Sequence, residues 1–521
     1  MYGHGQSYWP IVPTKPMNKE RRTELLRSRR TLNGHEGGNT GNSQRETPNA
    51  TQAKGDLTAE SVEGRGWAKG NPCEQNTRRT QGRESVHSAL ARIRRAAEQD
   101  KERRFTSLYH HVYSLEMLHE AYHSLKRDAA PGIDRQTWRE YGRGLPQRLE
   151  ELSAKLRRGA YRARPVRRSY VPKEDGRQRP IGVTALEDKV VQKATVMVLN
   201  AIYEVDFAGF SYGFRPGRSQ HNALDAVSVG LCKKVNRVLD ADVSGFFDAL
   251  NQDHLVKFLQ HRIADQRIIR LIQKWLAAGV LEDGRKEPTR RGTPQGGVIS
   301  PLLGNIYLHY VFDLWANQYR KKCCRGDVII VRYADDFVAG FQYQHEAENF
   351  LEELHQRFAK FDLKLHEDKT RLIEFGRYAE RDRKQRGESR PETFDFLGFT
   401  HYCGANNKGW FVVKRRTKQK KLRQKLKEVK GELKSRMHRP VPEVGRWLGT
   451  VLTGHYNYFG VPGNMDRMKA FRGEVARLWK RSLSRRSQKG YVTWERMKRL
   501  KKRYLPVPKI THPYPDQRLR V

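Results

Sequence analysis

Between residues 328 and 341 the chain reads Val328-Ile329-Ile330-Val331-Arg332-Tyr333-Ala334-Asp335-Asp336-Phe337-Val338-Ala339-Gly340-Phe341. β-Branched and aromatic residues favour strands, and only Ala334, Asp335 and Asp336 separate the two apolar runs. The stretch therefore predicts a β-hairpin with two carboxylates at its tip. Because paired aspartates in a turn often serve the turn alone, a catalytic interpretation needs a further acidic group nearby.

A second acidic segment lies earlier in the chain. A strand is predicted over residues 237–243, and it contains Asp240 and Asp242. With Ser244 and Gly245 the segment is similar to the start of a calcium-binding loop, but its twelfth position is Asn251 rather than glutamate. The preceding residues also predict a strand rather than a helix, which excludes the calcium loop.

Carboxylates at a strand end and at a hairpin tip can converge if the strands are neighbours in one sheet. Without a cation they would repel one another, and one would take up a proton. Two Mg²⁺ ions about 3.5–4 Å apart would remove this conflict. One ion would activate a primer 3′-hydroxyl for in-line attack on an α-phosphate, and the other would stabilise the departing pyrophosphate. The two segments therefore predict a site for nucleotidyl transfer.

The composition favours a nucleic-acid partner. The 521 residues include 101 Lys and Arg against 58 Asp and Glu, a net charge of +43, and such a charge favours a polyanion. A basic ribosomal-type protein without chemistry is the alternative that composition leaves open.

The five cysteines show no metal or disulfide spacing, which suits a reducing cytosol. The sequence contains no apolar run long enough to span a membrane, and residues 1–16 lack the apolar core of a secretory signal. We therefore expect a cytoplasmic protein without a membrane partner.

The pattern along the chain predicts an α/β (α+β) protein. Residues 1–87 are polar and basic without periodicity, and we expect them to be disordered or ordered on RNA. Helical spacing begins near Ser88, and Leu422, Leu426, Val429 and Leu433 recur at helical spacing among lysines. Helices are predicted over residues 115–126, 145–156, 186–203, 253–261 and 268–276 and from 300 to about 319, and strands over residues 164–172, 237–243, 328–333 and 337–341.

A glycine-rich loop, Gly292-Thr293-Pro294-Gln295-Gly296-Gly297, precedes a helix start at Ser300-Pro301, where the hydroxyl is expected to cap the helix. Glycines let a backbone approach a ligand closely, and Gln295 offers both a donor and an acceptor. No phosphate loop of the ATPase type occurs in the sequence, so an ATP-driven motor has no support.

Taken in order, the motifs resemble those of group II intron reverse transcriptases and maturases over residues 88–521. The matching segments are Ala130-Pro131-Gly132-Ile133-Asp134, Tyr170-Val171-Pro172-Lys173, Arg179-Pro180-Ile181-Gly182, Ser211-Tyr212-Gly213-Phe214-Arg215-Pro216-Gly217-Arg218-Ser219, the strand with Asp242, the glycine loop, Tyr333-Ala334-Asp335-Asp336, Leu365-His366-Glu367-Asp368-Lys369-Thr370 and Phe396-Leu397-Gly398-Phe399. In addition, Gly454-His455-Tyr456-Asn457-Tyr458-Phe459-Gly460 resembles the maturase region of the family.

The resemblance implies a right-hand polymerase. After the extension 1–87, residues 88–160 would form a helical part of the fingers, and residues 161–400 would form fingers and palm around an antiparallel sheet. A helical thumb, or maturase (X) domain, would follow over residues 401–462, and a basic DNA- or RNA-binding region over residues 463–521. The sequence ends at Val521 without the nuclease domain of larger family members, so second-strand cleavage is not expected.

The resemblance also implies roles for individual residues. Asp242, Asp335 and Asp336 would be the catalytic ligands of two Mg²⁺ ions, together with the carbonyl of Val243. For the incoming nucleotide, Lys173 and Arg179 would grip the triphosphate, Phe247 would exclude a ribose 2′-hydroxyl, and Gln295 would lie beside the base pair. Expected nucleic-acid contacts are Arg215, Arg218, Lys369, Lys421, Lys425, Tyr456, Tyr458, Arg485 and Arg486, with core packing as the alternative for the aromatic residues.

The implied function is an RNA-directed DNA polymerase that binds its intron RNA, assists its splicing and copies it during target-primed retrohoming. Its partners would be group II intron RNA, a DNA target or primer, and dNTPs; the sequence leaves the oligomeric state open. Two alternatives remain: an RNA chaperone without polymerase activity, and a domesticated relative serving a retron, a diversity-generating element or phage defence. The intact Tyr333-Ala334-Asp335-Asp336 motif argues against the first, and flanking catalytic RNA would decide the second.

Overall fold

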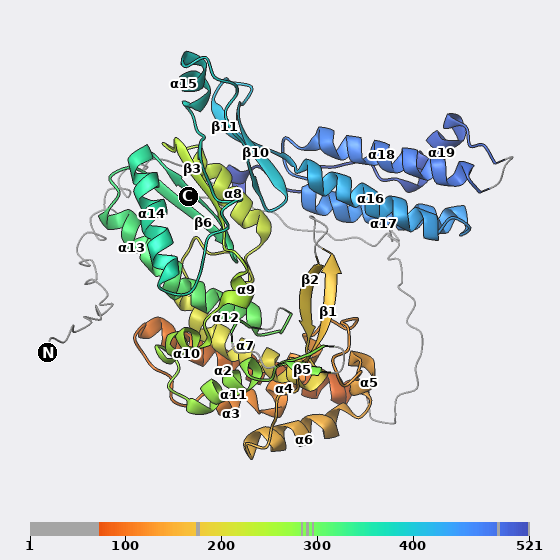
Figure 1. Ribbon diagram of the computed structural model, residues 1–521. Helices are drawn as coiled ribbons and strands as arrows, with labels where there is room; N and C mark the ends of the chain where they lie inside the picture. Colours follow the sequence, from red (N-terminus) through yellow and green to blue (C-terminus); the bar gives the residue numbers. More distant parts are fainter. Residues whose placement is uncertain are drawn as a thin grey trace, which may run out of the picture. The chain divides into compact units, whose positions relative to one another are not determined.

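The part of the chain that the computed structural model describes forms three β-sheets together with helices (Figure 1). The structure describes residues 72–172, 178–282, 285–287, 291–293, 296–486 and 490–518, all within one compact unit, Gly70–Val521. The predicted nucleotide contacts Lys173 and Gln295, and residues 1–71 of the predicted extension, lie outside the described residues. The predicted mixture of helices with antiparallel sheets is confirmed.

The acidic hairpin belongs to a four-stranded antiparallel sheet, which we call the central sheet. Its strand order is β6-β7-β3-β8, with β6 at Val328–Tyr333, β7 at Asp336–Phe341, β3 at Arg237–Asp242 and β8 at Arg371–Glu374. The predicted hairpin is confirmed, although β7 begins at Asp336. Only Ala334 and Asp335 therefore form the turn.

Side chains of the central sheet alternate between two cores, as the period of a strand requires. Leu239 and Ala241 join the larger core, which includes α7 (Leu186–Asp206) and α14 (Gln344–Ala359). Val238 joins a second core with α8 (Gln220–Leu231) and a three-stranded antiparallel sheet. That sheet contains β9 at Phe394–Phe396, β10 at Phe399–Ala405 and β11 at Phe411–Thr417.

The N-terminal helices pack around α7, whose side chains are buried over most of its length. The helix predicted to begin near Ser88 is α2, which begins at Pro72 and runs to Gln99. Among its side chains from residue 82 onward, Val86 is the first in the core. The sequence before Val86 lacks an apolar repeat, so its pattern could not predict a helix there. The other helices of this part are α3 (Tyr109–Val112), α4 (Leu115–His123), α5 (Trp138–Gly142) and α6 (Leu145–Arg157).

A third, mixed sheet has the order β2-β1-β4-β5, in which β1 and β4 run parallel. Its strands are β1 (Val166–Pro172), β2 (Gln178–Val183), β4 (Val280–Glu282) and β5 (Arg285–Glu287). Between β3 and β4 the chain forms the helices α9 (Phe246–Ala249), α10 (Gln252–Gln260) and α11 (Gln266–Leu276). The last two confirm predicted helices within two residues at each end.

The long helix predicted from Ser300 is interrupted by a π-turn. It consists of α12 (Ser300–Leu308), η1 (His309–Asp313) and α13 (Leu314–Lys322), and the Leu314 amide donates to the His309 carbonyl across the π-turn. The prediction that Ser300 caps this helix is wrong: Ile299 is the cap residue, and the Ser300 hydroxyl instead accepts a 2.9 Å hydrogen bond from Thr293.

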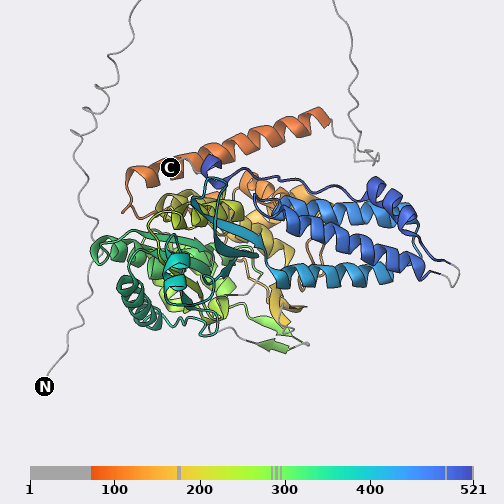
Figure 2. The same cartoon turned by 90° about the horizontal axis from the view of Figure 1, so that it is seen from above.

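The C-terminal helices share one core. They are α16 (Gln419–Ser435), α17 (Val441–Phe459), α18 (Met465–Ser484) and α19 (Trp494–Tyr504) (Figures 1 and 2). The predicted apolar face of α16 is confirmed, with Leu422, Val429 and Leu433 buried. The predicted regions 401–462 and 463–521 do not have separate cores, because Trp479 and Leu505 belong to the same core as α16 and α17.

The last described residues return to the helices that precede them. The amides of Thr511 and His512 donate to the Gly460 carbonyl at the end of α17, at 2.9 and 3.1 Å. The His512 ring stacks on His221 of α8 at 3.7 Å, and the short helix α20 (Pro515–Arg518) packs beside α8. The tail therefore joins α17 to α8.

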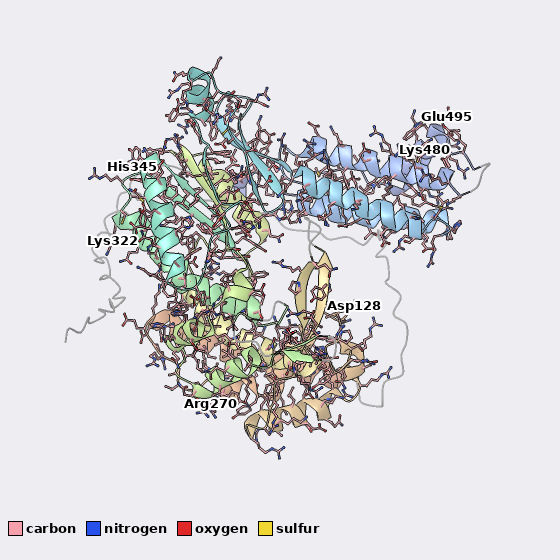
Figure 3. The ribbon with its side chains drawn as sticks, in the orientation of Figure 1. Asp128, Arg270, Lys322, His345, Lys480 and Glu495 are labelled. Atoms are coloured by element: carbon pink, nitrogen blue, oxygen red, sulfur yellow. The ribbon has the colours of Figure 1, made fainter. Side chains whose placement is uncertain are left out.

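The surface is rich in basic side chains, and exposed residues such as Arg270 and Lys322 point outward (Figure 3). Among the described helices, none combines the length and the apolar character that a membrane crossing requires.

Candidate active site

The register of the central sheet brings the predicted acidic residues together. Asp242, the last residue of β3, lies opposite Asp336, the first residue of β7. Directly opposed residues of antiparallel strands share a face, with Cβ atoms about 4.5–5.5 Å apart. Asp335 occupies the adjoining turn. Asp240 lies farther back on the same face, opposite Val338, and forms a 3.6 Å ion pair with Arg371.

The electrostatics of this cluster are unfavourable for three bare carboxylates. Burial raises the pKa of Asp336 well above its usual range, and the charges of Asp240, Asp242 and Asp335 raise it further. Burial and the charge of Asp242 also raise the pKa of Asp335, against the lowering effects of Arg179 and Lys369. Because each carboxylate disfavours ionisation of its neighbours, the cluster requires positive charge to be fully ionised.

A lysine already supplies part of that charge. The Lys369 ammonium forms an ion pair with the Asp242 carboxylate. The loop that carries it is fixed to β3, because the His366 amide donates to the Asp242 carbonyl at 2.8 Å and Val243 bridges to Leu365. Lys369 was predicted to contact nucleic acid; its position beside the aspartates depends on the loop geometry, which the sequence pattern does not encode.

The donor set fits a hard divalent cation. Carboxylate oxygens are the ligands that Mg²⁺ prefers, and two of the three acidic side chains come from directly opposed strand positions. Among the described residues, no three His, Cys, Asp or Glu side chains form a ready-made metal cage. Instead, the Lys369 ammonium stands in for a cation at Asp242.

The segment of residues 210–214 lies directly against the acidic hairpin. The Tyr212 amide donates to the Arg332 carbonyl at 2.8 Å, and a Cβ atom on Gly213 would lie 2.3 Å from the Ala334 nitrogen. Only glycine permits this approach. The next residue, Phe214, has a φ of +58° and a side chain that is 54% exposed, with its ring 6.3 Å from that of Tyr333. Sequence analysis missed Phe214, because nothing in the motif marks its positive φ.

Phe247, the predicted gate residue, is half-buried just beyond β3 and is held by the glycine loop. Its carbonyl accepts a 2.8 Å hydrogen bond from the Thr293 amide. At Gly292, where φ is +77°, a Cβ atom would lie 2.6 Å from the same carbonyl. The loop therefore packs closely against the backbone at Phe247.

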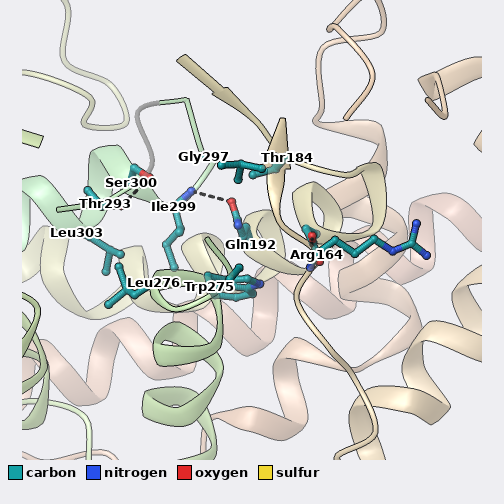
Figure 4. Close-up of a pocket in the computed structure, with 13 residues that line it drawn as sticks. Arg164, Thr184, Gln192, Trp275, Leu276, Thr293, Gly297, Ile299, Ser300 and Leu303 are labelled. Atoms are coloured by element: carbon teal, nitrogen blue, oxygen red, sulfur yellow. Dashed lines mark hydrogen bonds between the residues drawn. The ribbon is translucent and has the colours of Figure 1, made fainter. Parts of the chain in front are cut away.

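The described end of the glycine loop is anchored to α7. The Gln192 side-chain oxygen accepts a 2.9 Å hydrogen bond from the Val298 amide. It also accepts a 3.4 Å bond from the Ile299 amide (Figure 4). Gln192 and Ile299 line a small cavity, and Thr293 and Ser300, which are bonded to each other, line it as well. Of the predicted triphosphate contacts, Arg179 is described: it lies exposed on β2, and its charge acts on Asp335.

The predicted nucleic-acid contacts divide into interior and surface residues. Arg215 is buried, with a 3.0 Å ion pair to Glu204 and two hydrogen bonds to backbone carbonyls. Tyr456 is buried in the C-terminal core, whereas Tyr458 is half-buried and donates to the Leu397 carbonyl at 2.8 Å. These three side chains stabilise the fold. The residues Lys421, Lys425 and Arg485 are exposed, and Arg218 and Arg486 are partly exposed.

Part of the chain, including the three aspartates, is similar to known proteins. Residues 171–401 match the family described as reverse transcriptase (RNA-dependent DNA polymerase). Over 244 residues the chain is 36% identical to Protein YkfC of Escherichia coli K12, covering 41% of this chain and 64% of that protein.

Two intron-related proteins are also similar to the chain. Group II intron-encoded protein LtrA of Lactococcus lactis subsp. cremoris is 34% identical over 237 residues, covering 45% of this chain and 39% of that protein. Nuclear intron maturase 2 of Arabidopsis thaliana is 30% identical over 112 residues, covering 21% and 15%. The chain thus covers less than two thirds of the length of each of these relatives.

Proposed function

We propose that the chain copies RNA into DNA at Asp242, Asp335 and Asp336, because residues 171–401 match the reverse transcriptase family and the chain is similar to a group II intron-encoded protein. One observation carries the proposal. The register of β3 and β7 sets Asp242 opposite Asp336, with Asp335 in the adjoining turn. Residues from distant parts of the chain thereby meet at one end of one sheet.

Two Mg²⁺ ions would be held by these three carboxylates and the Val243 carbonyl. When bound, they would supply positive charge to the primer 3′-oxygen, the α-phosphate and the leaving pyrophosphate. The protein's own contribution is to hold the carboxylates at fixed strand and turn positions. Arg179 adds a positive charge near Asp335, where it would attract the triphosphate of a dNTP.

Specificity for deoxynucleotides would come from Phe247. The Thr293 amide bonds to the Phe247 carbonyl. This bond fixes the backbone at Phe247, and the ring would exclude a 2′-hydroxyl from that position. Lys173 would join Arg179 in binding the triphosphate, and Gln295 would lie beside the base pair. These roles come from the family resemblance of the motifs.

A right-hand arrangement accounts for the other parts. The central sheet would be the palm, the mixed sheet and the helices around α7 the fingers, and the bundle α16–α19 the thumb. RNA template and a DNA primer would bind between them, attracted by the net charge of +43. The similarity to an intron-encoded protein and to an intron maturase supports binding of a group II intron RNA and assistance of its splicing. Retrohoming is the use that the family resemblance of the motifs implies.

The test is primer extension on an RNA template with dNTPs and Mg²⁺. Asp335→Asn removes one ligand without changing the shape of the side chain, and cDNA synthesis should fall about a thousandfold or more. Asp128→Asn, at an exposed aspartate outside the site (Figure 3), is the matched control and should retain full synthesis. Full cDNA synthesis by D335N would overturn the proposal. RNA binding and splicing assistance should survive D335N, because they do not use the carboxylate.

A further inference from the structure

Arg332 immediately precedes the Tyr333-Ala334-Asp335-Asp336 segment and is completely buried at the end of β6. A guanidinium has five N–H donors, and here they serve four groups. Nε and Nη2 bind the two Asp313 oxygens at 2.7 and 2.6 Å. The other bonds are from Nη2 to Ser211 Oγ at 2.8 Å, and from Nη1 to Asn305 Oδ1 at 3.1 Å and to the Ala334 carbonyl at 2.9 Å.

The carboxylate partner comes from the π-turn. Asp313 is the last residue of η1 and is fully buried. His309, at the start of the same turn, lies 3.9 Å away from that carboxylate. Burial lowers the pKa of His309 to about 4, so this histidine is neutral and Arg332 provides the positive charge. π-Turns often occur at functional sites, and this one places a carboxylate behind the acidic hairpin.

The other end of the network is the turn itself. Ala334 has a φ of +59°, a conformation that is unfavourable for a residue with a side chain. Arg332 donates to the carbonyl of this residue, which precedes Asp335. Asn305 accepts from Arg332 and also donates to the Gly213 carbonyl at 2.7 Å. The buried guanidinium thus binds the strained turn through the Ala334 carbonyl and, through Asn305, the segment at Gly213 that packs against the turn.

We propose that Arg332 is a positioning residue for catalysis, which holds the Ala334 carbonyl so that the Asp335 carboxylate faces Asp242 and Asp336. This inference rests on the proposed polymerase function. It differs from a direct electrostatic role, because Asp313 neutralises Arg332, whereas Arg179 and Lys369 supply the positive charges that act on Asp335. Strained backbone at a functional site persists only where surrounding contacts determine it, and Arg332 makes those contacts.

Arg332→Lys is the first test. Lysine keeps the charge for Asp313, but its single ammonium cannot serve all four partners in the planar geometry of a guanidinium. We expect kcat for primer extension to fall at least about tenfold, with KM for dNTP changed less than about threefold. The Mg²⁺ concentration for half-maximal activity should rise several-fold. Mn²⁺ binding to the protein alone, measured by the loss of the free-ion EPR signal, should weaken by a similar factor.

A matched control separates positioning from stability. Arg262 is another buried arginine, paired with Asp206 at 2.9 Å and bonded to the carbonyls of Asp100 and Arg103. R262K should lower the melting temperature about as much as R332K, and yet leave kcat and Mn²⁺ affinity near wild type. Equal losses of kcat and Mn²⁺ affinity in R262K and R332K would overturn the positioning role.

A double variant guards against simple misfolding. R332M combined with D313L removes both buried charges, and replacing a buried ion pair by apolar residues often preserves stability. The variant should fold, as judged by circular dichroism, and bind Mn²⁺ as weakly as R332K. Wild-type kcat and Mn²⁺ affinity in this variant would refute the inference. Inactivity of the wild-type chain would instead count against the proposed polymerase function.

Discussion

Replacing His401 by phenylalanine tests the energetics of the core behind the active site. His401 is fully buried on β10, and its ring stacks on Phe394 at 4.7 Å with a 7° angle between the planes. Burial, with the nearby charge of Arg415, lowers the pKa of His401 from 6.5 to about 3. The imidazole is therefore neutral in the folded protein at any pH at which the chain would be handled.

The sign of the pH effect follows from this depressed pKa. The unfolded chain takes up a proton at His401 below pH 6.5, whereas the folded chain does so only near pH 3. The stability contributed by the neutral ring is present above pH 6.5 and is lost as the pH falls toward 3. At about pH 5 the gap to the unfolded pKa is about 1.5 units, and at about 1.4 kcal/mol per unit the loss is about 2 kcal/mol.

The assay is urea unfolding at about pH 7.5 and about pH 5, followed by circular dichroism. His401→Phe keeps an aromatic ring for the stack and removes the titration, so its free energy of unfolding should fall by about 2 kcal/mol less than that of the wild type on acidification. Other buried histidines titrate equally in both proteins and cancel. His345→Gln, at an exposed position, controls for the loss of an imidazole. Equal acid sensitivity of the wild type and H401F would refute the reasoning.

Three further outcomes are expected from the site. Phe247→Ala removes the ring proposed to meet a 2′-hydroxyl, so it should raise the ratio of ribonucleotide to deoxynucleotide incorporation about tenfold or more. Primer extension with single nucleotides measures this ratio, and an unchanged ratio would exclude the role. Phe214→Ala should weaken primer–template affinity, measured by fluorescence anisotropy, about fivefold to a hundredfold, which is the range for loss of one base–aromatic stack. The control is Tyr343→Ala, which removes an exposed ring at the N-terminal side of α14 and should leave the affinity unchanged. The double variant Lys421→Ala and Lys425→Ala should bind RNA more weakly. The slope of log affinity against log salt should become shallower by about one to two, and an unchanged slope would show that this face of α16 does not contact phosphate.

The central strands could be predicted from their runs of β-branched and aromatic residues, because strands that bury both faces read as nearly continuous apolar segments. The hairpin of β6 and β7 and the strand β3 are confirmed, and their apolar residues alternate between two cores. The pairing of Asp242 with Asp336 was expected only on the condition that the strands were neighbours. That condition depends on contacts between segments far apart in the chain, which local patterns do not encode.

The remainder could not be predicted for identifiable physical reasons. The π-turn that delivers Asp313 has no sequence signal, because its residues favour an ordinary helix equally well. Arg215 had the appearance of a phosphate ligand, but its partner Glu204 becomes visible only when α7 and the following loop are placed together. The segment of α2 before Val86 is helical without an apolar face, so periodicity could not detect it.

The returning tail adds an attachment between the C-terminal bundle and the rest of the chain. The bundle follows β11 directly, and it is also held where Asn464 bonds to Thr417 and where Tyr458 bonds to Leu397 and His221. The bonds of Thr511 and His512 to Gly460, together with the stack of His512 on His221, act as a clasp from α17 to α8. Cutting the chain after Leu505 would open this clasp while leaving the aspartates and the core of the bundle untouched, so fewer contacts would hold the bundle and it should move more freely against the sheets.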